Sequence, residues 1–263
     1  MYFAAVKTSN KYLMDPDSYN ELLEKNLQSK YKKAANEDLE NVTSEHQQVV
    51  KDFDLCERVF KTIPRASFFT LKDHKENFQN NPQVRLLNPT KFEIGKISKQ
   101  VLERIVKQLR TKLKLKQWFK QLPNKKRKLF IQFDIVSFYP SITPDLLNRA
   151  LEWAENHVEI TVEEKRVIKE SKKSFLYTGN TPWIKKGDVN FDIGMGAFDG
   201  AESCDLIGLY MLHLLATENP ELVEAGLFRD DGLCVSDATT RLTEKLRQKI
   251  VKDFRTMAWA PQV

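Results

Sequence analysis

The sequence has few of the features that mark secreted, membrane or zinc-finger proteins. Its 263 residues include only three cysteines, Cys56, Cys204 and Cys234, which are too few and too scattered for a disulfide framework or a zinc knuckle. It contains no run of 18 apolar residues that could span a bilayer, and its first residues lack the charged flank and apolar core of a signal peptide. No internal repeat is present. We therefore expect an intracellular protein, nuclear or cytoplasmic and not secreted, with no membrane partner.

Acidic residues are almost absent from one long stretch. Between Lys96 and Lys128 only Glu103 opposes a dense series of lysines and arginines, so this segment carries all of the net charge of +6 and the remainder is net acidic. Apolar residues recur every three or four positions from Ile94 to Leu113, which predicts one long helix with the bases on its outer face. A solvated helix face is the simpler explanation. A one-sided basic stripe also suits a polyanion.

A single acid stands at the end of an apolar run from Phe130 to Val136. This run predicts a strand, and Asp134 lies near its end, five residues before Tyr139. Burial disfavours a charged carboxylate, so Asp134 calls for a cationic partner.

A second stretch, Gly226–Val235, places two adjacent acids between apolar arms. Asp230 and Asp231 are predicted to lie in a hairpin turn closed by Gly232. Like charges repel, so such a pair is stable when exposed or when it holds a divalent metal. One acid from a strand together with an Asp-Asp turn is the ligand set of a two-metal phosphoryl-transfer site. The alternative is that Asp230–Asp231 is a solvated turn and Asp134 caps its strand.

Two further regions carry candidate binding residues. The strands predicted at 67–71 and 84–87 flank a polar loop, and Lys72, Lys75 and Arg85 are placed to meet a triphosphate, for which Arg offers bidentate contacts and Lys a point charge. The glycine-punctuated loop 194–202 contains Asp199 and Gly200 and leads into an apolar helix. Glycines there let the backbone approach a ligand closely, although the loop matches no dinucleotide or phosphate-loop fingerprint.

In this order the four motifs resemble those of reverse transcriptases, nearest to Penelope-like and non-LTR retroelements. Lys72-x-His74-Lys75 with Arg85 resembles the fingers motif, and Asp134-x4-Tyr139 the first palm motif. Asp199-Gly200 stands where the family has Gln-Gly, and Phe228-Arg229-Asp230-Asp231 where it has Tyr-x-Asp-Asp. The resemblance covers roughly residues 7 to 254. Two departures are the acid Asp199 and the loss of a hydroxyl at Phe228.

The resemblance implies an α+β right-hand polymerase palm, an antiparallel sheet with packed helices, plus a fingers subdomain and no thumb. Residues 1–128 would form the fingers and basic helix region, and residues 129–263 the palm. Asp134, Asp230 and Asp231 would hold two Mg²⁺ ions, with Mn²⁺ as a substitute.

The resemblance also implies roles for the other candidates. Lys72, Lys75 and Arg85 would grip the triphosphate, Tyr139 would exclude a 2′-hydroxyl, and Asp199 with Gly200 would shape the nucleotide pocket. The partners would be dNTPs and an RNA or DNA template with a primer, whose phosphates would follow the basic helix.

Three alternatives to a retroelement reverse transcriptase fragment remain. The Asp134–Ile142 stretch is also close to the first motif of family B DNA polymerases, but the later Asn-Ser-x-Tyr-Gly helix is absent. An RNA-dependent RNA polymerase shares the paired acids, while Tyr139 favours deoxynucleotides. The third alternative is a catalytically inactive remnant that binds nucleic acid.

Overall fold

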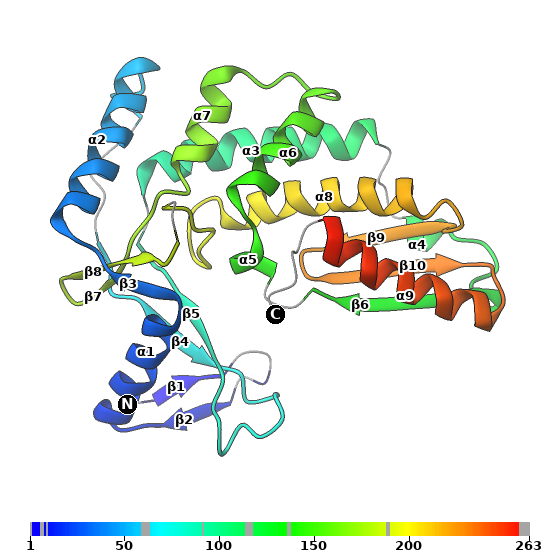
Figure 1. The fold of residues 1–263 in the computed structure, drawn as a ribbon, viewed down its shortest axis with the longest axis horizontal. Coiled ribbons are helices and arrows are strands. Elements are labelled where there is room, and N and C mark those ends of the chain that lie inside the picture. Colours follow the sequence, from blue (N-terminus) through cyan, green and yellow to red (C-terminus); the bar gives the residue numbers. More distant parts are fainter. Residues whose placement is uncertain are drawn as a thin grey trace. The chain divides into compact units, whose positions relative to one another are not determined.

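The structure, a computed structural model, describes residues 2–5, 8, 10–58, 64–90, 92–113, 118–135, 138–187 and 190–257. The chain forms two compact units, each built from two segments: unit 1 is Met1–Ile97 with Arg166–Gly200, and unit 2 is Ser98–Lys165 with Ala201–Val263. Both units mix helices and antiparallel strands (Figure 1), as an α+β protein requires. We had expected one boundary at 128/129, and the assignment of fingers and palm to these segments remains a prediction.

In the part of unit 1 that the structure describes, three small sheets and two helices lie wholly within the unit. Its elements are β1 (Tyr2–Ala4), β2 (Lys11–Leu13), α1 (Pro16–Lys30), β3 (Tyr31–Lys33), α2 (Asn36–Asp52), β4 (Phe68–Leu71), β5 (Val84–Leu87), β7 (Leu176–Thr178) and β8 (Thr181–Lys185). Strands pair antiparallel as β1-β2, β4-β5 and β3-β8-β7. The hairpin predicted from the strands at 67–71 and 84–87 is confirmed. An amphipathic period after Asp15-Pro16 predicts a helix to Tyr31, and the Gly179-Asn180 turn predicts a hairpin over residues 175–184; α1 and the β7–β8 pair confirm both.

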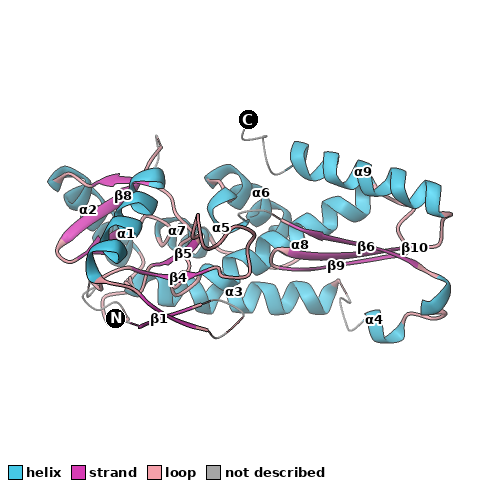
Figure 2. Ribbon diagram, turned by 90° about the horizontal axis from the view of Figure 1, so that it is seen from below, coloured by secondary structure: helices cyan, strands magenta, loops and turns pink. Residues whose placement is uncertain are grey.

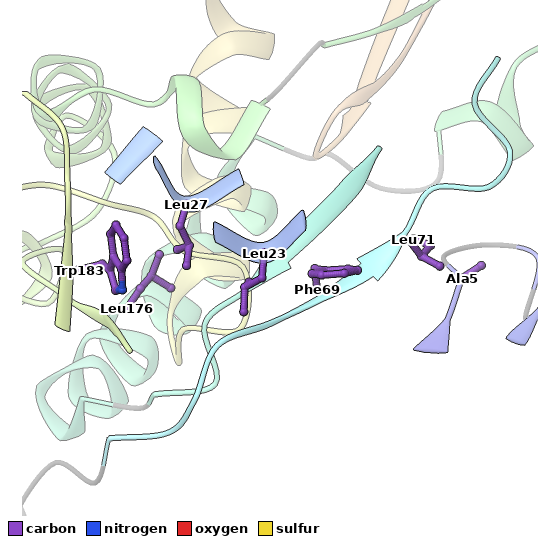
Figure 3. Packing of buried hydrophobic residues seen from close by; sticks show 7 residues of the cluster. All are labelled: Ala5, Leu23, Leu27, Phe69, Leu71, Leu176 and Trp183. Carbon is purple, nitrogen blue, oxygen red and sulfur yellow. The ribbon is translucent and has the colours of Figure 1, made fainter. Parts of the chain in front are cut away.

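The core of unit 1 joins these small sheets to α1. Leu23 and Leu27 of α1 pack with Phe69 and Leu71 of β4 and with Trp183 of β8, and Figure 3 shows these side chains in one row. The ring of Tyr19 stacks on that of Phe69 at 4.5 Å. The β4–β5 hairpin, which carries Lys72 and Arg85, is therefore anchored on α1 by its buried face.

Unit 2 is a three-stranded antiparallel sheet covered by helices. Its elements are α4 (Trp118–Gln121), the 3₁₀ turn η1 (Lys125–Arg127), β6 (Leu129–Asp134), α5 (Phe138–Ser141), α6 (Pro144–Glu155), β9 (Glu224–Phe228), β10 (Asp231–Ser236) and α9 (Thr240–Met257). Three further helices have residues in both units: α3 (Glu93–Lys112), α7 (Val162–Glu170) and α8 (Gly200–Glu218). The strand order is β6-β10-β9.

Local capping explains where the helices begin. Thr143 accepts a hydrogen bond from the Leu146 amide at the start of α6. The sequence Thr161-Val162-Glu163-Glu164 predicts a capping box, and Thr161 and Glu164 form it at the start of α7. Apolar residues from Val49 to Val59 predict a second helix that follows Thr43-Ser44-Glu45. The helix begins earlier: α2 starts at Asn36, where the Asp38 carboxylate accepts from the Ala35 amide at 2.8 Å. Val59 lies outside the described residues.

The sequence analysis did not find the shortest strands. The three-residue strands β1, β2 and β3 were not expected, because so short a run carries no measurable alternation. No helix among the described residues is both long enough and apolar enough to cross a bilayer.

Candidate active site

The register of unit 2 brings the two acidic motifs face to face. In the β6–β10 pair Asp134 lies directly opposite Asp231, and the Ile135 amide donates to the Asp230 carbonyl at 2.8 Å. Because 135 and 230 are the hydrogen-bonded pair, 134 and 231 form the adjacent non-hydrogen-bonded pair, whose Cα atoms lie about 4.5 Å apart. Both side chains project from the same face of the sheet. The expected proximity of Asp134 to the Asp-Asp turn is thus built into the strand pairing.

The turn that carries Asp230 is a two-residue hairpin. Phe228 pairs with Asp231, so Arg229 and Asp230 are the two central residues. The positive φ that such a hairpin needs, +57°, falls on Arg229. Our expectation that Gly232 closes the turn was wrong, because Gly232 lies within β10.

Gly232 serves a different purpose on the face opposite the acids. It pairs with Phe133, whose ring lies across the glycine so closely that an added Cβ would be 2.1 Å from a ring carbon. The other side of that ring contacts Phe254 of α9, with centroids 5.0 Å apart. The absence of a side chain at 232 therefore allows the helix to pack close beneath the acids.

The two faces of this sheet differ sharply. Ile131 and Cys234 are buried against Leu215 of α8 and against Leu246 and Ile250 of α9, and Figure 2 shows α9 running along the strands. Asp134 and Asp231, on the other face, are exposed, and Asp230 is half-buried. One face builds the core, and the other leaves the carboxylates accessible at the end of the sheet that carries them, although Val235 is buried on that face further along β10.

Tyr139 lies within electrostatic range of the acidic turn. It follows β6 on the short helix α5 and is half-buried. Burial is the main reason why its pKa is raised to about 12, followed by the Cys204 thiol, and Asp230 adds to the rise while Arg229 opposes it. The phenol is therefore neutral at physiological pH, and its surroundings include the residues of the 229–230 turn.

The acids do not form a closed metal cage. No group of three His, Cys, Asp or Glu side chains within the described part of the chain is arranged to hold a metal ion by itself. Two facing carboxylates nevertheless repel each other and are hard oxygen donors. This donor set fits Mg²⁺, which proteins commonly bind through one or two carboxylates together with substrate phosphates.

In unit 1 two of the three expected triphosphate ligands, Lys72 and Arg85, share one face of the β4–β5 hairpin. Arg85 pairs with Thr70, and the Lys72 amide donates to the Gln83 carbonyl at 2.8 Å, which continues the ladder. Lys72 and Arg85 are therefore diagonal neighbours, about 7–8 Å apart along that face. Arg85 Nε and Thr70 Oγ1 are buried and have no hydrogen-bond partner among the described residues.

The loop with Lys75 is held in place from one side. Asp73 accepts hydrogen bonds from the Thr8 hydroxyl at 2.6 Å, the Asn10 amide group at 2.9 Å and the Tyr12 hydroxyl at 2.9 Å. These bonds, that from Thr8 above all, lower the pKa of Asp73. Lys75, two residues further, is exposed.

Asp199 is enclosed rather than presented to solvent. Its side chain is 2% exposed and forms an ion pair with Lys172, which is 1% exposed. The Ser171 hydroxyl donates to the same carboxylate at 2.7 Å. The sequence analysis did not identify Lys172, because it lies 27 residues before Asp199 among several other lysines and nothing in the sequence distinguishes it from them. A direct contact between Asp199 and a nucleotide stays a prediction.

The loop before α8 needs its glycines for close backbone contacts. Gly196 has φ +100°, and a Cβ there would lie 2.5 Å from the Asn88 carbonyl oxygen. Gly200 is the first residue of α8, and its own Cβ would lie 2.9 Å from the Gly194 carbonyl oxygen. These contacts fold the loop back on itself inside unit 1.

Part of the basic stripe is neutralised within unit 2. Arg104 pairs with Glu164 at 2.6 Å and Arg110 with Asp205 at 2.9 Å, while Lys128, only 8% exposed, pairs with Asp237 at 2.6 Å. Lys107, Lys126 and Arg127 are not in an ion pair with any described residue and point to solvent. The simpler explanation, a solvated and internally paired face, holds for the first group.

Solved structures of polymerases share this fold. No protein-family model and no curated protein matches the sequence. The chain is similar to telomerase from Candida tropicalis (TM-score 0.59, 11% identity, 98% of this chain and 56% of that one) and to telomerase from Candida albicans in complex with a fragment of telomeric RNA (TM-score 0.52, 10%, 96% and 46%). The RNA-dependent RNA polymerase of a human picobirnavirus is also similar (TM-score 0.55, 9% identity, 91% and 56%).

These similarities establish the fold. The predicted α+β polymerase fold, with an antiparallel sheet and packed helices, is confirmed, and the similar structures include two telomerases and a viral RNA-dependent RNA polymerase. The chain spans about half the length of these neighbours.

Proposed function

We propose that this chain carries the catalytic centre of an RNA-directed DNA polymerase of the retroelement type, which adds dNTPs to the 3′-hydroxyl of a primer. The observation that supports it most is the pairing of Asp134 with Asp231 on the open face of a sheet within a polymerase fold. Two facing carboxylates beside a tight turn cost stability unless a cation neutralises them. Such a site is built for a ligand.

Asp134 and Asp231 would hold Mg²⁺, with Asp230 next to them in the turn and Mn²⁺ as a substitute ion. Such ions activate the primer hydroxyl and neutralise charge on the transferred phosphoryl group and on the departing pyrophosphate. The chain's own contribution is to fix the two carboxylates by strand pairing, so that they need not reorganise during the reaction.

Tyr139 would select the sugar. Its ring is held against Phe138, with centroids 6.1 Å apart, and its hydroxyl is kept neutral by burial. A fixed ring beside the acidic turn would clash with a 2′-hydroxyl, so discrimination against ribonucleotides would come from sterics rather than from charge. This is the feature that favours a DNA-synthesising enzyme over the RNA polymerase that shares the fold.

Lys72, Lys75 and Arg85 would hold the triphosphate. Arg85 supports this role because its buried Nε lacks a partner, as does Thr70 Oγ1 beside it. Buried unpaired polar atoms are rare in folded proteins and call for an explanation such as an absent ligand. Gly200 would shape the nucleotide pocket through the backbone, while Asp199 would act through its pairing with Lys172.

The test is primer extension on an RNA template with dNTPs and Mg²⁺. The chain is expected to extend the primer, to prefer dNTPs over rNTPs, and to lose at least about 10²-fold in rate in Asp231→Asn. Asp145→Asn, which removes an exposed carboxylate on α6, is the matched control and should extend normally.

Each outcome bears on one alternative. Extension with rNTPs alone would identify an RNA polymerase. Extension on DNA templates alone would favour a DNA-directed enzyme. No extension under any condition, with nucleic-acid binding retained, would leave an inactive binding remnant and overturn the proposal.

A further inference from the structure

Two phenylalanines of unit 2 are exposed side by side. Phe119 of α4 and Phe130 of β6 are 45% and 42% exposed, and their ring centroids lie 6.1 Å apart. This spacing is that of an interacting aromatic pair. Full burial of both rings would stabilise the fold further, so two neighbouring rings that stay nearly half in water indicate a binding surface.

The rings lie beside a rigid basic turn. Lys125 places its ammonium 5.0 Å from the centre of the Phe119 ring, within cation–π range. Asn124 adopts the left-handed conformation, with φ +51° and ψ +37°, and the Arg127 amide donates to its carbonyl at 2.9 Å. The turn is therefore shaped before any ligand arrives.

Lys128 anchors this turn to the sheet. Its ion pair with Asp237 uses one base of the four and leaves Lys126 and Arg127 exposed. We call Phe119, Phe130, Lys125, Lys126 and Arg127 the aromatic–basic platform.

The platform and the acids lie on the same face of the same strand. The exposed residues 130, 132 and 134 alternate with the buried Ile131 and the half-buried Phe133, so Phe130 and Asp134 project to one side. Four residues of strand span about 13 Å. A chain bound along this face would pass the carboxylates at one end and the aromatic pair at the other.

Exposed aromatic rings within a cluster of positive charge match one kind of partner well. Unpaired nucleic acid offers flat bases that stack on aromatic side chains and phosphates that attract lysine and arginine. In a duplex the base faces are stacked on one another and cannot contact the rings. An acidic peptide would pair with the lysines and arginine but has no bases to stack on the two rings. The combination thus favours a single strand.

We propose that the aromatic–basic platform binds an unpaired stretch of nucleic acid, with a base stacked on Phe130 and its phosphates near Lys126 and Arg127. The idea that the platform holds a template or primer strand near the acids rests on the function proposed above. It adds a contact that distinguishes bases from backbone, at a distance of a few nucleotides from the reaction.

The experiment measures the affinity of the whole chain for a fluorescent oligo-dT strand and for an abasic strand of the same length and charge. Phe130→Ala is expected to weaken oligo-dT binding about tenfold, in line with the loss of one stacked base. It should change abasic binding less than about twofold, because that strand has no base to lose. Phe130→Tyr, which keeps a ring, should restore the affinity.

Phe68→Ala is the matched control, since Phe68 is an exposed phenylalanine (43%) on unit 1. It should leave oligo-dT affinity unchanged. Phe130 is 42% exposed and lies opposite the buried Val235, so Phe130→Ala is expected to lower the midpoint of thermal unfolding, and binding is measured well below that midpoint. The double variant Lys126→Gln with Arg127→Gln should weaken the binding of both the oligo-dT and the abasic strand and should lower the salt dependence of that binding.

The proposal is overturned if Phe130→Ala leaves oligo-dT affinity unchanged, as it would if the platform were a protein-binding surface. Equal losses on the oligo-dT and abasic strands would also overturn it. Primer extension by the wild-type chain, measured beside these affinities, separates the two proposals. A chain that never extends a primer but shows the base-dependent loss keeps the platform and refutes the polymerase. A chain that extends primers but whose oligo-dT affinity does not change in Phe130→Ala keeps the polymerase and refutes the platform.

Discussion

Removing the charge of Lys172 is expected to destabilise unit 1 strongly. The Lys172 and Asp199 side chains are 1% and 2% exposed and are paired with each other, and Ser171 adds a hydrogen bond to the carboxylate. Lys172→Met would leave a buried carboxylate facing an apolar side chain. Breaking a buried pair by deleting one partner costs about 3–5 kcal/mol, several times the typical effect of a substitution.

Replacing both partners should behave differently. In Lys172→Met with Asp199→Leu no charge is left unpaired, and apolar replacements of buried ion pairs are often neutral or stabilising. We expect the free energy of unfolding of the double variant to lie within about 1 kcal/mol of the wild type. The coupling energy of the pair is the summed cost of the two single variants minus the cost of the double variant, about 5–11 kcal/mol if each single variant costs about 3–5 kcal/mol.

Urea unfolding monitored by circular dichroism measures these differences for the wild type, both single variants and the double variant. Single variants that cost less than about 1 kcal/mol, as exposed ion pairs do, would refute the assignment of a buried pair. A double variant whose free energy of unfolding is as low as that of the less stable single variant would also refute it.

The same variants separate two roles for Asp199. If Asp199 acts by positioning the loop before α8, the double variant should extend primers with a KM for dNTPs close to that of the wild type. If the carboxylate meets the nucleotide directly, KM should change in the double variant although its stability is restored. The structure favours the first outcome because the carboxylate is enclosed by Lys172 and Ser171.

Two further predictions concern the catalytic sheet. Gly232→Ala should cost about 1–3 kcal/mol in urea unfolding, because its Cβ would lie 2.1 Å from the Phe133 ring and force that ring against α9; an unchanged unfolding midpoint would contradict the close packing. For Tyr139 the native pKa of about 12 exceeds the ordinary value of 10.0. The unfolded chain loses this proton first, so stability should be fully present below pH 10 and should fall as pH rises from 10 to 12. Tyr139→Phe removes this contribution, and its unfolding free energy should decline less over the same range.

Long amphipathic helices and polar-capped helix starts could be predicted from the sequence. The period of the apolar residues in α3 and the capping box at Thr161 are local signals, and both elements are confirmed. Short strands such as β3 could not be predicted, because Tyr31–Lys33 becomes a strand only through pairing with β8, some 150 residues away. Tertiary pairing, and not local preference, decides such segments.

The basic segment shows a different limit of sequence analysis. Composition gives its charge correctly but not which charges are available to a ligand. Arg104, Arg110 and Lys128 are paired with acids that lie 60, 95 and 109 residues away. Only the folded chain separates these structural bases from the exposed pair Lys126 and Arg127.

The acidic turn shows why a motif alone under-determines a site. Asp230 and Asp231 are equivalent in the sequence, yet adjacent residues of a strand point to opposite faces and residues of a turn to neither. The hairpin ends its turn at Asp230 and begins its strand at Asp231, so that only Asp231 is paired with Asp134. A shift of register by one residue would remove this pairing and turn Phe133 out of the core. The packing of Phe133 over Gly232 and against Phe254 opposes that shift. The buried face of the sheet therefore fixes which carboxylates meet on the exposed one.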